Sequence, residues 1–167
     1  MRSTRPGVAG LALLAALSLS ACGNDQPPDD DPGTSRVSED AAEKSGTGET
    51  RTDLEPLTKR FSALGDPVAA TWMSGTMGSS DVPGPSTYWI DAVVEVTPAQ
   101  ADELRRDYAP KSTDAAPDVI AGLRDSLPDE PLLTSAELNG AFTEGRFGAT
   151  AYLAPASHCV VLVALGE

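Results

Sequence analysis

Apolar and polar residues alternate in several segments of the C-terminal two thirds of the chain. The clearest pattern spans 88–96, and segments 68–72 and 147–153 alternate in the same way. Because successive residues of a strand face opposite sides of a sheet, 88–96 is predicted to be a strand with one buried and one solvated face. The run 159–165 is apolar at every position, which predicts a central strand covered on both sides.

Helical spacing of apolar residues predicts three short helices. The first spans 54–64 and has Asp53 as its expected N-terminal cap. The second begins with the capping-box pattern Thr97-Pro98-Ala99-Gln100, and the third spans 119–127. The order of these elements predicts an α+β domain, a mainly antiparallel sheet with about three helices.

Two further segments lack a clear period. Residues 74–86 are rich in Gly, Ser and Pro and are predicted to be a loop. Within 131–145, Asn139-Gly140 is typical of a hairpin turn, with a short strand as one option before it.

The first residues of the chain have the pattern of a secretory signal peptide. Arg2 and Arg5 precede an apolar run of about eleven residues, which is too short to span the hydrocarbon core of a membrane as a helix. We therefore interpret 1–21 as a targeting segment that is not part of the fold.

The end of this segment reads Leu19-Ser20-Ala21-Cys22. It resembles the lipobox of bacterial lipoproteins, in which an aliphatic residue and two small residues precede a cysteine. The resemblance implies that Leu19, Ser20 and Ala21 direct cleavage, that Cys22 then receives a diacylglycerol, and that the protein is anchored at the extracytoplasmic face of the cell membrane. Two acyl chains suffice for stable anchoring. The alternative is an ordinary secretory cleavage that leaves Cys22 without a lipid.

Charge and composition divide the remaining chain. Residues 22–50, which begin with the lipidated cysteine, contain few apolar side chains and many acidic ones, so we predict a disordered acidic linker there. All eight aromatic residues lie in 51–167, the predicted globular domain. This domain has 17 acidic and eight basic residues, a net charge of −9 that excludes nucleic acid as a partner.

The sequence contains no recognisable catalytic constellation. His158 is the only histidine, and no Gly-x-Ser-x-Gly motif is present. Asp91 and Glu95 share one face of the predicted strand, but at ~13 Å they are too far apart for a glycosidase pair. We interpret them as part of the solvated face, and we assign no catalytic residue, metal ligand or cofactor.

A few side chains remain as candidates for binding. Met73 and Met77, with His158 and Cys159, would suit Cu(I) only if the fold joined them. Cys159 alone is expected to be a buried, inert thiol. Trp89 is the best candidate for an exposed aromatic anchor, and packing beneath a loop or helix is the equal alternative.

These observations favour a lipid-anchored protein whose domain binds a ligand, either an envelope protein or a small molecule, without catalysis. The first alternative is an extracytoplasmic enzyme of the hydrolase type, and a minor one is a copper-binding lipoprotein. Convergent carboxylates in a deep pocket would favour the enzyme. A flat apolar sheet face around Trp89 would favour the binding protein.

Overall fold

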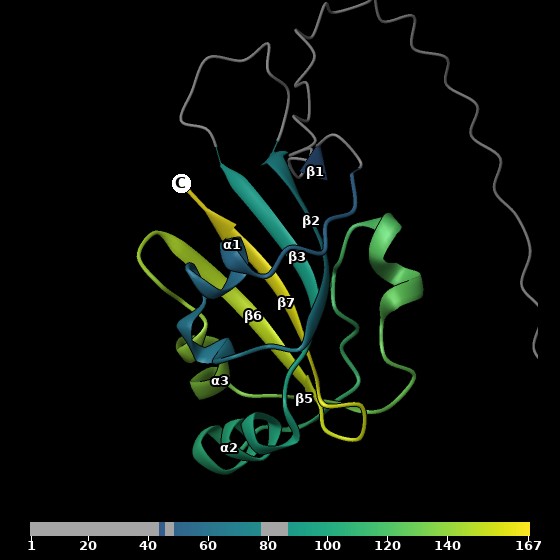
Figure 1. Ribbon diagram of the computed structural model, residues 1–167, viewed down its shortest axis with the longest axis vertical. Coiled ribbons are helices and arrows are strands. Elements are labelled where there is room, and N and C mark those ends of the chain that lie inside the picture. The colour runs from purple at the N-terminus through teal and green to yellow at the C-terminus, as the bar shows by residue number, and fades with distance from the viewer. Residues whose placement is uncertain (1–43, 46–48, 78–86) are drawn as a thin grey trace, which may run out of the picture. The chain divides into compact units, whose positions relative to one another are not determined.

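The computed structural model describes residues 44–45, 49–77 and 87–167. Their strands form one antiparallel sheet in the order β1-β2-β3-β7-β6-β5-β4 (Figure 1). The strands are β1 (Lys44–Ser45), β2 (Ala69–Met77), β3 (Tyr88–Glu95), β4 (Lys111–Thr113), β5 (Leu132–Thr134), β6 (Phe147–Ala154) and β7 (Cys159–Gly166). The helices are α1 (Glu55–Thr58), α2 (Pro98–Tyr108) and α3 (Ala136–Ala141), with two 3-10 helices, η1 (Ser62–Leu64) and η2 (Ala121–Ser126).

The expected α+β class with a mainly antiparallel sheet is confirmed. The helices differ slightly in number from the three expected, because two 3-10 helices accompany the three α-helices. The apolar run predicted as a central strand is β7, which lies between β3 and β6. Its two faces belong to two different apolar clusters, with Leu162 in the larger and Val161 in the smaller. This double burial explains why β7 lacks the alternation of a half-exposed strand.

The larger cluster fills the sheet face that carries α1, η1, α2 and α3. Leu57 and Phe61 pack there beside Leu104 of α2 and Phe142, which follows α3, and all four are fully buried. The smaller cluster lies on the opposite face, where Leu123 of η2 covers the sheet. Figure 1 shows η2 and its flanking coil standing apart from the other helices, beside β2 and β3.

The expectation that one face of β3 is solvated is wrong. Trp89 and Asp91 lie on the expected polar face, yet they are 1% and 0% exposed. The segment around Val119 and Leu123 packs over this face and removes both side chains from water. Only Glu95, at the end of the strand, is exposed as expected.

The helix predicted over 54–64 is interrupted. It forms α1 and the separate η1, because the backbone of Phe61 leaves the helical region at φ −126° and ψ 81° and its ring enters the core. Asp53 does not cap α1, since its carboxylate accepts hydrogen bonds from Arg51.

The predicted cap of the next helix is confirmed in its main part. The Thr97 hydroxyl accepts a hydrogen bond from the Gln100 amide at 3.2 Å, as a capping residue should. The Gln100 side chain does not complete the box, because it donates to the carbonyl of Ala63. The helix predicted over 119–127 is present as the shorter η2.

Asn139-Gly140 is not a hairpin turn, because both residues belong to α3. The helix is capped by Ser135, whose hydroxyl accepts from the amide of Leu138. The Asn139 side chain accepts from the amide of Ala151 at 2.8 Å and so joins α3 to β6. The optional short strand before this segment is present as β5.

Two residues inside the predicted linker are part of the sheet. Lys44 and Ser45 form β1, which pairs with Met77 and Thr76 of β2. The signal segment, Cys22 and most of the linker lie outside the described residues. Within the described part of the chain, no helix is long and apolar enough to cross a membrane.

Candidate ligand-binding pocket

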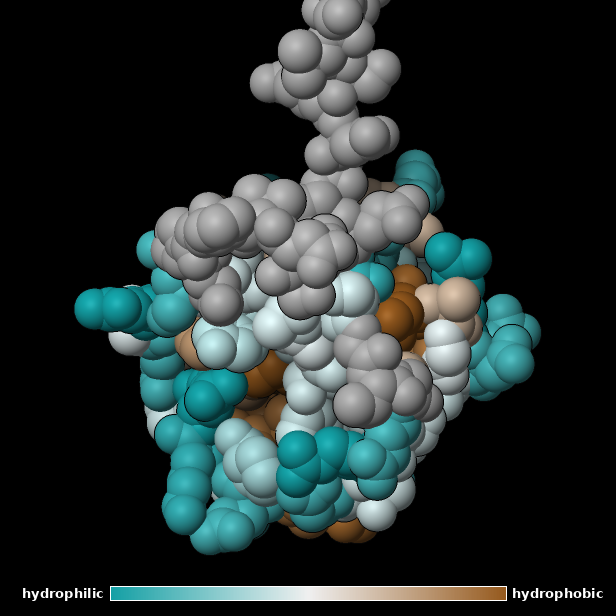
Figure 2. Space-filling view, turned by 90° about the horizontal axis from the view of Figure 1, so that it is seen from above, coloured by the Kyte–Doolittle hydropathy of each residue, from teal (hydrophilic) through white to brown (hydrophobic). Residues whose placement is uncertain are grey.

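A pocket of about 670 Å³ opens between α1 and the ends of β2, β3 and β6. This volume lies within the range of small-molecule sites, roughly 300–1,000 Å³. Figure 2 looks onto this end of the folded region and shows hydrophobic atoms in a hollow bordered by hydrophilic residues. The chain therefore offers a concave surface with an apolar interior and a polar rim.

The sheet supplies the floor of the pocket through the two-residue period of its strands. Trp72, Ser74 and Thr76 point to one face of β2, and Tyr88 is paired with Thr76 from β3. Tyr88 is 49% exposed, although it is a large aromatic residue. An aromatic ring at the mouth and two hydroxyls on the floor give the site both apolar and hydrogen-bonding surface.

Sequence reasoning missed this floor because it assigned residues 74–86 to a loop. Ser74 to Met77 continue β2, and Gly75 lies in register with Trp89 of β3. The Gly and Ser content of this stretch obscured the strand. The alternation of Trp72, Ser74 and Thr76 was the signal that could have revealed it.

Phe147 forms a wall of the pocket in a stack that depends on a glycine. A side-chain carbon placed on Gly166 would lie 2.6 Å from the Phe147 ring, so only glycine lets the ring lie against β7. The Arg60 guanidinium lies over the same ring, 4.4 Å from its centroid. Gly166, Phe147 and Arg60 thus form three layers at the pocket wall.

A second cation, Arg51, stacks on the other side of the pocket. Its guanidinium lies 4.1 Å from the centre of the Trp72 ring and pairs with the Asp53 carboxylate at 2.5 Å. The hydrogen bond from Arg51 holds the pKa of Asp53 below its ordinary value. The Trp72 indole donates to the Asp53 carbonyl at 2.9 Å, which fixes the ring at the pocket.

Charge is distributed unevenly between the pocket and the rest of the domain. Three of the eight basic residues in 51–167 line it, Arg51, Lys59 and Arg60, whereas Glu167 is the one acidic residue among its described lining residues. Arg51 and Lys59 each have a carboxylate partner. Arg60 has no ion pair among the described residues, so its charge is available to a ligand.

The buried face of β3 holds a separate polar group that is not part of this pocket. The Asp91 carboxylate pairs with the Lys44 ammonium at 2.9 Å and accepts from the Ile120 amide at 2.6 Å. Burial raises the pKa of Asp91 above its ordinary value, although the contact with Lys44 opposes this. Because Asp91 is fully enclosed and hydrogen-bonded, its role is to join β1, β3 and the coil before η2.

Trp89 packs beside this ion pair and is not an exposed anchor. Its indole nitrogen donates to the carbonyls of Ser45 and Thr76, at 2.7 and 3.1 Å. The alternative interpretation, in which the ring packs beneath a covering segment, is therefore the one the structure bears out.

The fold does not gather the candidate copper ligands. Cys159 is in register with Glu95, and Met73 is in register with Asp91, which lies four residues earlier in β3. This offset separates the two sulfur-bearing residues by ~13 Å along the strand direction. Met77 lies further still toward the opposite end of β2. Across residues 44–45, 49–77 and 87–167, no group of three or more His, Cys, Asp or Glu residues is placed to hold a metal ion.

Cys159 is half-buried at the start of β7, and it is less enclosed than the sequence predicts. Burial raises the pKa of its thiol, and Glu95 and Glu130 add to this effect. A raised pKa leaves less of the reactive thiolate at a given pH.

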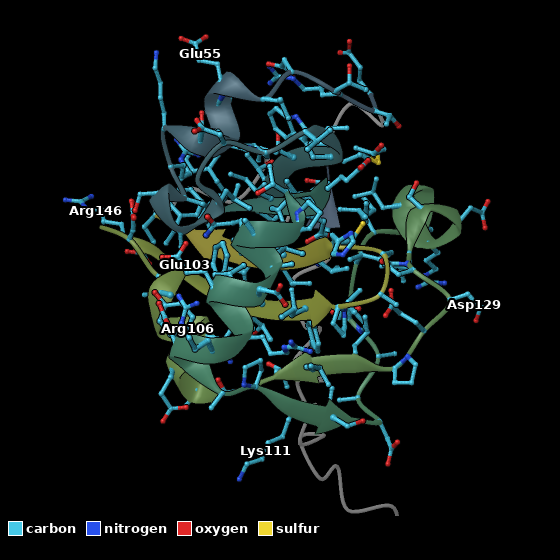
Figure 3. The ribbon with its side chains drawn as sticks, turned by 60° about the horizontal axis from the view of Figure 1, so that its bottom comes forward. Glu55, Glu103, Arg106, Lys111, Asp129 and Arg146 are labelled. Carbon is cyan, nitrogen blue, oxygen red and sulfur yellow. The ribbon has the colours of Figure 1, made fainter. Side chains whose placement is uncertain are left out.

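Lys111 and Asp129 project outward from separate places on the folded region, whereas Glu103 and Arg106 lie near each other on α2 (Figure 3). Comparisons of the chain with protein-family models, with curated proteins and with solved structures find no match.

Proposed function

We propose that this protein is a bacterial lipoprotein, held at the extracytoplasmic face of the cell membrane by a lipid on Cys22, whose globular domain binds a small molecule without catalysis. The anchor is supported by the resemblance of Leu19-Ser20-Ala21-Cys22 to a lipobox. The acidic linker that follows would hold the domain away from an anionic surface. The observation that carries the binding function is the pocket between α1 and the sheet.

The composition of the pocket favours binding over hydrolysis. A glycosidase site needs two carboxylate side chains flanking the scissile bond, and Glu167 is the one acidic side chain among the pocket's described lining residues. Ser74 and Thr76 offer hydroxyls, but His158 lies in the turn between β6 and β7, at the other end of β6 from Phe147. Neither hydroxyl therefore has an imidazole base beside it.

Filling the pocket tests whether it binds ligands. Ser74→Phe places a ring on the floor between Trp72 and Thr76, and we expect it to weaken binding of the dye anilinonaphthalene sulfonate at least tenfold. The measurement is a fluorescence titration of the mature chain carrying Cys22→Ser, which has no lipid to bind the dye. Arg146→Gln is the control, because Arg146 points away from the folded region (Figure 3) and does not line the pocket. Equal dye affinity in the Ser74→Phe protein would show that the dye binds elsewhere.

The anchor is tested by detergent phase partitioning of the protein expressed in a bacterial host. We expect Cys22→Ser to move the protein from the detergent phase to the aqueous phase, because the thiol that receives the lipid is lost. Cys159→Ser makes the same chemical change at the other cysteine and should leave the protein in the detergent phase. An unsubstituted protein found in the aqueous phase would refute the anchor.

A further inference from the structure

We infer that the pocket selects small molecules that carry one acidic group on a flat apolar body, and that Arg60 binds the acidic group. This inference rests on the proposed binding function, because it assigns a ligand class to the same pocket. It follows from which cation is free, which surfaces are apolar and how the charge of the domain is arranged.

Arg60 is the cation of the pocket with binding capacity to spare. Arg51 is paired with Asp53, and Lys59 is paired with Glu55 at 2.7 Å. The contact that holds the Arg60 guanidinium is with the face of Phe147, which leaves the edge of the guanidinium and its N–H donors for other partners. A guanidinium edge matches the two oxygens of a carboxylate, sulfonate or phosphate group, and stacking on a ring reduces the entropy lost when it binds.

The remaining surface of the pocket suits a flat apolar body. Tyr88, which is 49% exposed, and the half-buried Phe147 supply accessible aromatic rings. Trp72, Leu57 and Ile90 lie behind them and form a buried apolar backing. Aromatic side chains bind flat groups through stacked and edge-on contacts. A volume of about 670 Å³ accommodates a molecule of this kind but not a folded partner.

The charge of the whole domain favours a small soluble anion over an anionic membrane surface. Residues 51–167 carry a net charge of −9, which repels an extended layer of acidic headgroups. A small molecule inside the pocket instead meets the unpaired charge of Arg60, because Arg51 and Lys59, the other two cations among the described lining residues, are already paired with carboxylates. The geometry therefore favours a free anion that enters from solution.

Two dyes with the same ring system separate the acidic group from the apolar body. Anilinonaphthalene sulfonate carries a sulfonate, and phenylnaphthylamine is its uncharged counterpart. In the mature chain carrying Cys22→Ser, we expect the sulfonate dye to bind about tenfold more tightly than the neutral dye, because a hydrogen-bonded charge adds this much. Arg60→Gln should weaken binding of the sulfonate dye about tenfold and leave the neutral dye unchanged.

Arg146→Gln is the matched control, because it removes the same charge one residue before Phe147 but outside the pocket. It should change neither affinity. Vesicles of phosphatidylglycerol form a separate arm, and we expect no co-sedimentation with the non-acylated protein.

The outcomes distinguish this inference from the function on which it rests. In one outcome both dyes bind equally, Arg60→Gln changes neither affinity, and Ser74→Phe abolishes binding of both. The pocket would then bind ligands without selecting an acidic group, so the inference would fail while the proposed binding function would stand. If neither dye binds, both fail. Vesicle binding that is lost in Arg60→Gln would make the membrane surface the partner and would overturn the assignment of a soluble ligand.

Discussion

Replacing Lys44 by methionine is expected to lower the free energy of unfolding by about 3 kcal/mol at neutral pH. Lys44 supplies the counter-charge for Asp91, a fully buried carboxylate whose other contact is the Ile120 amide. Methionine retains the apolar stem of lysine but leaves this carboxylate without a cation. The measurement is urea unfolding followed by far-UV circular dichroism.

The loss of stability should depend on pH in a defined direction. Burial raises the folded-state pKa of Asp91 above its unfolded value, and removing Lys44 raises it further. The stabilisation that such a group gives the folded state is fully present below its unfolded pKa, and it is lost as the pH rises through the folded pKa. The deficit of Lys44→Met should therefore shrink when unfolding is measured at about pH 4, near the ordinary carboxyl pKa.

Two further variants separate this effect from a general loss of charge. Lys59→Met breaks the exposed pair with Glu55 and should cost less than about 1 kcal/mol. Adding Asp91→Leu to Lys44→Met removes both partners and should restore much of the lost stability, because no buried charge then remains. A Lys44→Met protein as stable as the unsubstituted one at neutral pH would contradict the buried ion pair.

Trp89→Ala is expected to lower the free energy of unfolding by about 4 kcal/mol, the largest loss that we predict. The indole ring is 1% exposed and packs beneath the segment that contains η2, so its removal leaves a cavity in the smaller apolar cluster. Its contacts with Ser45 and Thr76 would also be lost. The measurement is urea unfolding at constant pH.

Trp89→Phe isolates the polar part of this loss. Phenylalanine retains most of the apolar surface but cannot donate to the carbonyls of Ser45 and Thr76, so we expect a cost of about 1–2 kcal/mol. If Trp89→Ala cost less than Trp89→Phe, or less than about 1 kcal/mol, the ring would be a surface residue, as one interpretation of the sequence had it.

The parts of the fold that were predictable depend on signals within a few residues of each other. Continuous apolar character identified β7, and Thr97 with Gln100 marked the start of α2. The helix at 54–64 failed where a local signal competed with packing, since Phe61 leaves the helical conformation to enter the core. The turn predicted at Asn139 failed for a similar reason. Its side chain accepts a hydrogen bond from the Ala151 amide, and this contact between α3 and β6 outweighs the local preference for a turn.

The polar face of β3 could not be interpreted from its own sequence. Asp91 looks solvated until Lys44, 47 residues earlier, and Ile120, 29 residues later, are brought to it by the fold. The pocket has the same origin, because Arg60, Ser74 and Phe147 come from three segments of the chain that meet only in the fold. Contacts between residues so far apart in the sequence produce no periodic pattern of apolar and polar residues from which they could be predicted.

The most direct test of the central claim, a binding domain tethered by an acylated cysteine, is the mass of the mature protein isolated from the membranes of a bacterial host. The account predicts that the polypeptide begins at Cys22 and carries the added mass of a diacylglycerol on that residue. A mature chain of unmodified mass, or a precursor that retains residues 1–21, would contradict it.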